Sequence, residues 1–284
     1  MGRKAQRKTA KTTTAVAALL LATLACGEPG GPDGTPVEPV VYETARFRIE
    51  DLSGRPPAEL EALGARLEAE FGRVAALLSG FALPPIPITF RIEAGLGMPF
   101  VTLGANRMTQ WSEAIRPQYF THQLTHMFTR YQRTVFLEEG LAVWASEMLE
   151  TGDLRPDPYR GQPTHAWVSL FEQYGSTINL FTALGADNLS HDFRGSSPDA
   201  SAWQLFIEAG SFTRWLIDEH GFDRWLVFFA TGSTASAIGL NTVETEQVWL
   251  GYATSQHPNP LACEAALGEV GPRETFWCAR TRGQ

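Results

Sequence analysis

The sequence predicts an α+β fold, because strand-like and helical segments alternate in its first half and its second half is mostly helical. Residues 42–49 have the composition of a strand, and apolar and polar residues alternate over 87–93. Between them, apolar residues recur at helical spacing over 58–79. The expected elements after residue 117 are all helices.

The first helix and the second strand have the clearest patterns. The helical repeat over 58–79 ends at Gly80 and consists of Leu60, Leu63, Leu67, Phe71, Val74 and Leu78. The strand at 87–93 follows. The less regular stretch 100–111 is a candidate for a third strand.

The later helices are expected at five places. Pro117 suits the first turn of a helix that continues to about residue 130, and a second helix covers about 136–150. Residues 151–200 are rich in Gly, Pro, Asp and Ser and hold few periodic runs. The remaining helices are expected at 201–219, 222–230 and 242–252. The first two are separated by His220-Gly221, a histidine in a last turn followed by a capping glycine.

Composition indicates a folded, acidic protein. The 284 residues are 44% hydrophobic and include 17 Phe and 8 Trp, enough for one domain with terminal extensions or for two small domains. The net charge is -8, and five basic residues lie in the first eleven positions. The rest of the chain has 18 basic against 31 acidic residues, a balance of -13. This acidity argues against nucleic acid as a partner.

The N-terminus has the pattern of a targeting segment. A basic stretch is followed by an apolar run over 15–25, too short to span a bilayer as a mature helix. The run ends in Leu21-Ala22-Thr23-Leu24-Ala25-Cys26, which resembles a bacterial lipobox, although Thr23 stands where that pattern prefers leucine. The resemblance implies a signal peptide over 1–26, lipidation at Cys26, and an exported protein anchored to the cell envelope. An ordinary cleaved signal peptide is the alternative.

Three further regions follow the predicted signal peptide. Residues 27–40 are nearly all Gly, Pro and acidic, which is typical of a flexible tether. A folded domain is expected over 41–255, and a C-terminal tail over 256–284. Cys263 and Cys278 in this tail are expected to form a disulfide in an oxidising compartment. A metal site there would need more ligands than the tail offers.

The segment 119–147 has the residues for a metal site. His122 and His126 are four apart on a predicted helix, so both imidazoles lie on one face and can bind a single ion. Zinc prefers nitrogen and oxygen ligands, and a catalytic site keeps one position for water, so a third protein ligand is required. Glu139 is the candidate, which follows after twelve intervening residues at the start of the next helix.

The context of Glu139 resembles a known family. Phe136-Leu137-Glu138-Glu139-Gly140-Leu141-Ala142 resembles the second-helix motif of gluzincins, in which the glutamate before glycine is the third zinc ligand. The strand–helix–strand lead-in and the segment 209–221 (AGSFTRWLIDEHG) are similar to the peptidase MA-like family of zinc metallopeptidases. The resemblance covers about 42–253 and implies a thermolysin-like fold with one zinc ion. The spacer before Glu139 is shorter than in thermolysin.

Position 123 departs from the family pattern. Gluzincins have His-Glu-x-x-His, whereas this chain has His122-Gln123-Leu124-Thr125-His126. The family's glutamate takes a proton from the attacking water and passes it to the leaving amine, and a neutral amide cannot accept that proton. Since general acid–base catalysis contributes about 10²–10⁴-fold, weak or no peptidase activity is expected.

Other residues could support such a site. Glu138 could replace the base. However, successive helical residues point about 100° apart, so we expect Glu138 to face away from the metal and to be an acidic residue stabilised by the dipole at the start of its helix. Glu147 could contact a ligating histidine or, as we favour, lie on a solvated face. Candidates for stabilising an oxyanion are Tyr174, His165 and His191, each expected at the surface.

Three functions follow from these observations. The first is a degenerate zinc metallopeptidase. The second is a non-catalytic lipoprotein that binds a peptide or an envelope component in the same cleft, with the membrane contacted through its lipid anchor. The third is an active metallohydrolase with an unorthodox base.

Overall fold

The computed structural model describes the central part of the chain. The described residues are 38–95, 100–112, 115, 118–130, 133–149, 163–173, 175, 177–180, 184 and 200–258. The chain divides into two compact units, Met1–Val37 and Glu38–Gln284, and all described residues belong to the second. The predicted signal peptide with Cys26, most of the tether, and Cys263 and Cys278 lie outside the described residues.

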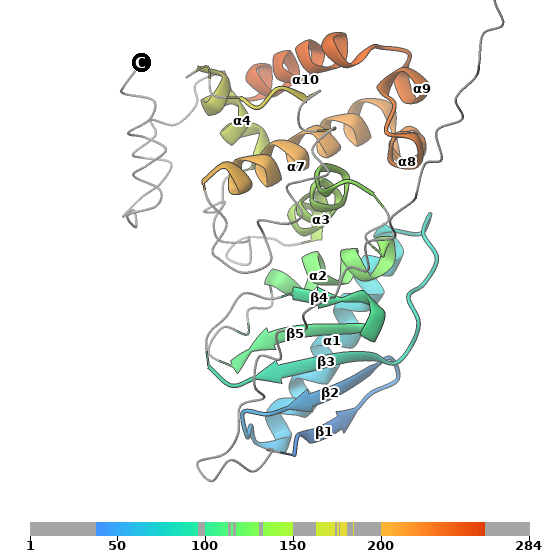
Figure 1. Cartoon of the computed structure of the whole chain (residues 1–284), viewed down its shortest axis with the longest axis vertical. Helices are drawn as coiled ribbons and strands as arrows, with labels where there is room; N and C mark the ends of the chain where they lie inside the picture. The colour runs from blue at the N-terminus through green and yellow to red at the C-terminus, as the bar shows by residue number, and fades with distance from the viewer. Residues whose placement is uncertain are drawn as a thin grey trace, which may run out of the picture. The chain divides into compact units, whose positions relative to one another are not determined.

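A five-stranded mixed sheet forms the first half of the described fold (Figure 1). Its spatial order is β1-β2-β3-β5-β4. The inner strands β2, β3 and β5 are parallel, and each edge strand is antiparallel to its neighbour. The strands are β1 (Val40–Glu43), β2 (Phe47–Asp51), β3 (Ile88–Glu93), β4 (Phe100–Thr102) and β5 (Arg107–Trp111). Together with the helices, this sheet confirms the α+β class.

The single strand predicted over 42–49 is wrong, because these residues form the hairpin of β1 and β2. Tyr42 is paired with Ile49 in the antiparallel register. The turn is fixed from outside: Glu68 on α1 (Pro57–Leu77) accepts hydrogen bonds at 2.6 Å from Thr44 Oγ1 and from the Arg46 N–H. The contact that ends the first strand therefore comes from a distant helix, and the sequence pattern of residues 42–49 gives no sign of it.

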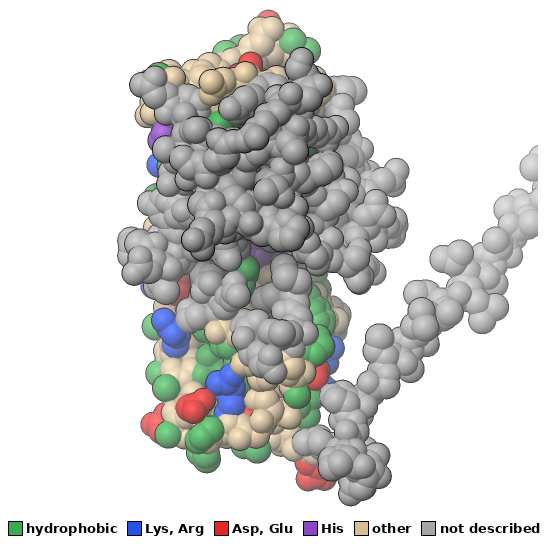
Figure 2. Space-filling view, turned by 90° about the vertical axis from the view of Figure 1, so that its left-hand side faces the viewer, with side chains coloured by type: hydrophobic (Ala, Val, Ile, Leu, Met, Phe, Trp, Pro, Cys, Tyr) green, Lys and Arg blue, Asp and Glu red, His purple; other side chains and the backbone are tan. Residues whose placement is uncertain are grey.

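Helix α1 covers one face of the sheet. Its apolar stripe is buried, as are the alternate strand residues beneath it. The opposite face carries ion pairs such as Arg48–Glu50 at 3.1 Å and Arg91–Glu93 at 2.6 Å. Figure 2 likewise shows basic and acidic side chains interspersed over the described part of one face. Such partly exposed pairs contribute little stability and mainly keep the surface polar.

The predicted helices are confirmed within a few residues, and two of the helices whose bounds lie in the described ranges were missed. The confirmed ones are α1, α2 (Gln118–Thr129), α3 (Val135–Leu149), α7 (Ala200–His220), α8 (Phe222–Thr231) and α10 (Thr242–Gln256). As predicted, α7 ends at His220, and Gly221 follows at a φ of 87°, a left-handed conformation that suits glycine.

The missed helices are α4 (Thr164–Gln173) and α9 (Thr234–Ile238). Trp167, Val168, Leu170 and Phe171 of α4 are buried and have helical spacing, but the surrounding glycines and prolines masked this signal. A short 3-10 helix, η1 (Leu103–Ala105), lies between β4 and β5.

Helices α2 and α3 lie between the sheet with α1 and the C-terminal helices (Figure 1). Helix α2 packs on α1 and α3, and α3 packs on α7. Phe212 of α7 is fully buried at the centre of the helical half. Its ring lies 5.3–5.7 Å, centroid to centroid, from those of Phe136, Trp215, Phe228 and Trp249. None of the helices within the described ranges is long and apolar enough to cross a membrane.

Two glycines permit the close approach of α3 and α7. A Cβ atom at Gly140 would lie 2.6 Å from Thr213 Oγ1 and 2.7 Å from the Ala209 carbonyl oxygen. A Cβ at Gly210 would overlap the Val143 side chain. Since Gly140 directly follows Glu139, this contact also fixes how closely α3 approaches α7 at Glu139.

Gly140→Ala is expected to lower the free energy of unfolding by about 1–3 kcal/mol, because a backbone carbonyl cannot turn aside from the added methyl group. The control is Gly72→Ala on α1, where a Cβ meets nothing within 4 Å. That change should raise the unfolding free energy by about 0.5–1 kcal/mol, since alanine favours helix. Urea unfolding of both variants measures the difference, and equal effects would contradict the close approach.

Candidate metal centre

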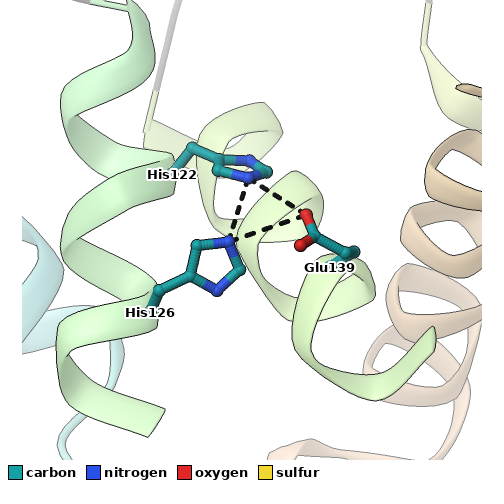
Figure 3. Close-up of side chains that lie close together, drawn as sticks. All are labelled: His122, His126 and Glu139. Atoms are coloured by element: carbon teal, nitrogen blue, oxygen red, sulfur yellow. Dashed lines mark hydrogen bonds and ion pairs between the residues drawn. The ribbon is translucent and has the colours of Figure 1, made fainter. Parts of the chain in front are cut away.

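Three side chains converge between α2 and α3 (Figure 3). His122 Nε2 lies 3.1 Å from His126 Nε2 and 3.1 Å from Glu139 Oε2. His126 Nε2 lies 3.6 Å from the same Glu139 oxygen. These residues form a group that could hold a metal ion, and within the described ranges no other such group of His, Cys, Asp and Glu occurs.

The helices themselves position these side chains. His122 and His126 are one turn apart on α2, so their imidazoles project from the same face. Glu139 lies near the start of α3, where the Gly140 contact with α7 holds the helix. His126 and Glu139 are buried, while the side chain of His122 is 17% exposed. His122 is therefore the most exposed of the three side chains.

The separations fit a tetrahedral ion. Ligand atoms bound at about 2.0–2.2 Å with tetrahedral angles lie roughly 3.3–3.5 Å from one another. The three observed separations, 3.1, 3.1 and 3.6 Å, bracket this range. The two imidazole nitrogens and one carboxylate oxygen thus fit a three-ligand site with a fourth position left over.

Glu139 is held as a carboxylate. Burial by itself raises its pKa, but the imidazoles of His126 and His122 outweigh burial and hold the pKa of Glu139 well below its usual range. An ionised carboxylate is the form that binds a cation. The site is therefore ready to coordinate a metal at neutral pH.

Glu138 has a different task from its neighbour. As predicted, its carboxylate does not belong to the metal-binding group; it accepts hydrogen bonds from Thr129 Oγ1 and from the Arg133 N–H. Its burial is complete, and this burial raises the pKa of Glu138 despite the Thr129 hydrogen bond. Glu138 thereby ties the end of α2 to the start of α3.

A second carboxylate holds the other end of α2. Thr121 Oγ1, next to His122, donates to Glu70 of α1, and Glu70 also pairs with Arg73. The ligand helix is thus fixed to α1 near one histidine and to α3 beyond the other. Sequence reasoning missed Thr121, Thr129 and Glu70, because the partners of both threonines come from other helices and leave no local pattern.

Gln123 lies beside the metal-binding group. On a helix it is about 100° round from His122 and about 60° from His126, so it flanks the same face. It is only 7% exposed. Across the described part of the chain, its side-chain amide makes no hydrogen bond. The amide is not among the buried polar atoms without a partner, so it is in contact with solvent and open to a ligand.

Glu147 does not lie on a solvated face, which corrects the expectation. It accepts hydrogen bonds at 2.8 and 3.0 Å from the N–H and Oγ–H of Thr164 at the start of α4. It also pairs with Arg214 at 3.4 Å. Nor does it contact a ligating histidine: it joins α3 to α4 and α7.

His165, one candidate oxyanion stabiliser, is buried, whereas a surface position was expected. Its Nδ1 lies 2.8 Å from Ser211 Oγ, which also accepts a hydrogen bond from Trp249 Nε1 at 3.0 Å. Its ring contacts Tyr252, and none of its described contacts is with the metal-binding group. Tyr174 and His191 lie outside the described residues.

We expect Glu138→Gln to weaken metal binding about 10–100-fold, the usual effect of losing a residue that orients ligands. An amide has one acceptor oxygen, so either Thr129 or the Arg133 N–H loses its partner. Titration with Zn²⁺ against a chromophoric chelator measures the affinity. Glu147→Gln is the matched control, because Glu147 binds the N–H and hydroxyl of Thr164 on the same helix. Equal metal affinity in the two variants would refute the role of Glu138.

His165 makes the folded state sensitive to acid. Burial, with the nearby charges of Arg214 and His257, lowers the pKa of His165 to about 3 from 6.5. The neutral ring stabilises the fold fully above pH 6.5. This stability is lost as the pH falls towards 3, because only the unfolded chain then binds the proton.

His165→Asn should therefore flatten the fall in unfolding free energy between pH 6.5 and 3, by on the order of 4 kcal/mol. Urea unfolding at several pH values tests this. His220→Asn, at the exposed end of α7, controls for the loss of an imidazole. The same slope in His165→Asn and the wild type would contradict the assignment.

Two comparisons with known proteins find no match. No protein-family model matches the chain, and no curated protein is similar to it at a significant level. The resemblance to gluzincins therefore stays a prediction, and the chemistry of the site follows from its own residues and geometry.

Proposed function

We propose that this chain is a zinc metallopeptidase-like protein of the gluzincin type with weak or no peptidase activity. The observation that carries the proposal is the convergence of His122, His126 and Glu139 from two helices at separations that suit one ion. The mixed sheet, the ligand helix and the helical second half are compatible with a gluzincin fold.

Zinc is the metal that best fits the donor set. Two imidazole nitrogens and one carboxylate oxygen make the His₂Glu set of catalytic zinc sites, whereas magnesium and calcium prefer oxygen ligands alone. When bound, zinc supplies Lewis acidity that polarises a carbonyl group or lowers the pKa of water. The chain would hold the ion through the imidazoles of His122 and His126 and the Glu139 carboxylate.

Gln123 is the reason for expecting little catalysis. It occupies the motif position of the family's base, and an amide is neutral over the working pH range and cannot accept a proton there. Glu138 is the nearest carboxylate in sequence outside the metal-binding group, but Thr129 and the Arg133 N–H engage it. These contacts disfavour an active hydrolase with an unorthodox base.

A non-catalytic binding protein is the second candidate. The amide of Gln123 favours it: it makes no hydrogen bond within the described residues and can donate to a ligand without taking part in proton transfer. The ligand would be a peptide or an envelope component held at the same centre.

We also propose that the protein is exported and anchored to the bacterial envelope through lipid on Cys26. The basic, apolar and Cys26-ending order of residues 1–26 supports this. Mass spectrometry of protein from its native host should find Cys26 as a lipidated N-terminus. An unlipidated N-terminus downstream of Cys26 would rule the anchor out.

The proposal is tested first by metal content. Protein purified without chelator should contain about one zinc per chain, and His122→Ala should lose it, because two ligands rarely suffice for a tight site. Elemental analysis of the two proteins decides the point. A wild-type chain without any first-row metal would overturn the zinc assignment.

The second step restores the missing base. In zinc-loaded protein, Gln123→Glu should raise peptide hydrolysis by about two orders of magnitude or more, following the size of general-base effects. Glutamine and glutamate are nearly isosteric, so the change should fold without strain. Hydrolysis of a broad peptide library by both proteins measures the gain. Equal rates near background would favour the binding protein, and wild-type activity unaffected by the change would favour the unorthodox base.

A further inference from the structure

Resting on the proposed metal site, we propose that the centre binds the carboxylate group of an acidic ligand, with Gln123 donating a hydrogen bond to it. The proposal names the class of ligand that the site takes. Three features of the described residues carry it: the charge of the centre, the unpaired amide, and the engagement of the neighbouring carboxylate.

The first feature is charge. Imidazoles bind metals in their neutral form, so Glu139 is the single anionic ligand in the group. A divalent ion held by these residues keeps one positive unit of charge. A glutamate at position 123 would cancel that unit, whereas Gln123 leaves it in place. The glutamine therefore turns an electrically neutral centre into one that attracts an anion.

The second feature is the amide of Gln123. It is 7% exposed and makes no hydrogen bond anywhere in the described part of the chain. Its nitrogen carries two N–H donors, and the amide is not among the buried polar atoms without a partner, so these donors are open to an acceptor on a ligand. A carboxylate oxygen is an acceptor of matching strength, since hydrogen bonds to ionised groups are stronger than those between neutral groups.

The third feature is that the neighbouring carboxylate is occupied. Glu138 directly precedes the ligand Glu139, but its carboxylate accepts from Thr129 and from the Arg133 N–H. Glu138 therefore does not compete with an incoming carboxylate. The partial exposure of His122, at 17% of its side chain, gives a small anionic group a way in.

The carboxylate group could belong to either of two kinds of ligand, the C-terminus of a peptide or a small organic acid. Three probes separate them: an N-acetylated tripeptide with a free C-terminus, the same peptide with a C-terminal amide, and acetate. Binding to the zinc-loaded chain is measured by calorimetry. Binding to the cobalt-substituted chain is followed by the visible spectrum, which changes when an anion enters the coordination sphere.

We expect the free-acid peptide to bind the wild type at least about ten-fold more tightly than its amide, because only the acid matches the positive centre. Gln123→Glu should weaken acid binding by about ten-fold or more, since it cancels the charge and removes the donor. Gln247→Glu, the same change on the exposed face of α10, is the control and should bind like the wild type. If acetate binds as tightly as the free-acid peptide, the result would support a carboxylate ligand and identify it as a small organic acid.

Metal analysis separates failure of this inference from failure of the proposed function. A chain that loads no metal overturns both. A metal-loaded wild type that binds acid and amide alike overturns the ligand class alone, and this comparison requires no variant to fold. If the Gln123→Glu variant keeps its full metal content and its full affinity for the free-acid peptide, the proposed role of Gln123 is wrong.

Discussion

The buried carboxylate of Glu138 joins the end of α2 to the start of α3, and the metal-binding group depends on this connection. Two ligands lie on α2 and one on α3, so the turn between the helices sets how they meet. Glu138 accepts from Thr129 on one side and from the Arg133 N–H on the other. Two consecutive residues thus have different roles: Glu138 holds α2 and α3 together, and Glu139 belongs to the metal-binding group.

Gln123 separates the geometry of the centre from its chemistry. The distances among His122, His126 and Glu139 suit a metal whether or not position 123 can accept a proton. A carboxylate there would serve proton transfer, while an amide serves recognition and leaves the charge of the ion uncompensated. The two functions that we propose, peptide hydrolysis and ligand binding, thus differ in one terminal group of one side chain.

The sequence predicted what depends on short-range pattern. Spacing on one helix placed His122 and His126 together, but Glu139 was selected by motif resemblance, because the approach of α3 to α2 is a tertiary contact. Glu147 and His165 were misjudged for the same reason: their partners, Thr164 and Ser211, lie 17 and 46 residues away. The Thr44–Arg46 turn was likewise hidden, since Glu68 on α1 stabilises it.

The close packing of Gly140 against α7 gives the metal a mechanical role. His122 and His126 belong to a helix that packs on α1, whereas Glu139 belongs to a helix that packs on α7. The ligands therefore come from two helices held by different neighbours, and any separation of α2 from α3 would pull the third ligand from the first two. A bound ion would link the two helices directly, so that metal binding would favour their packed state.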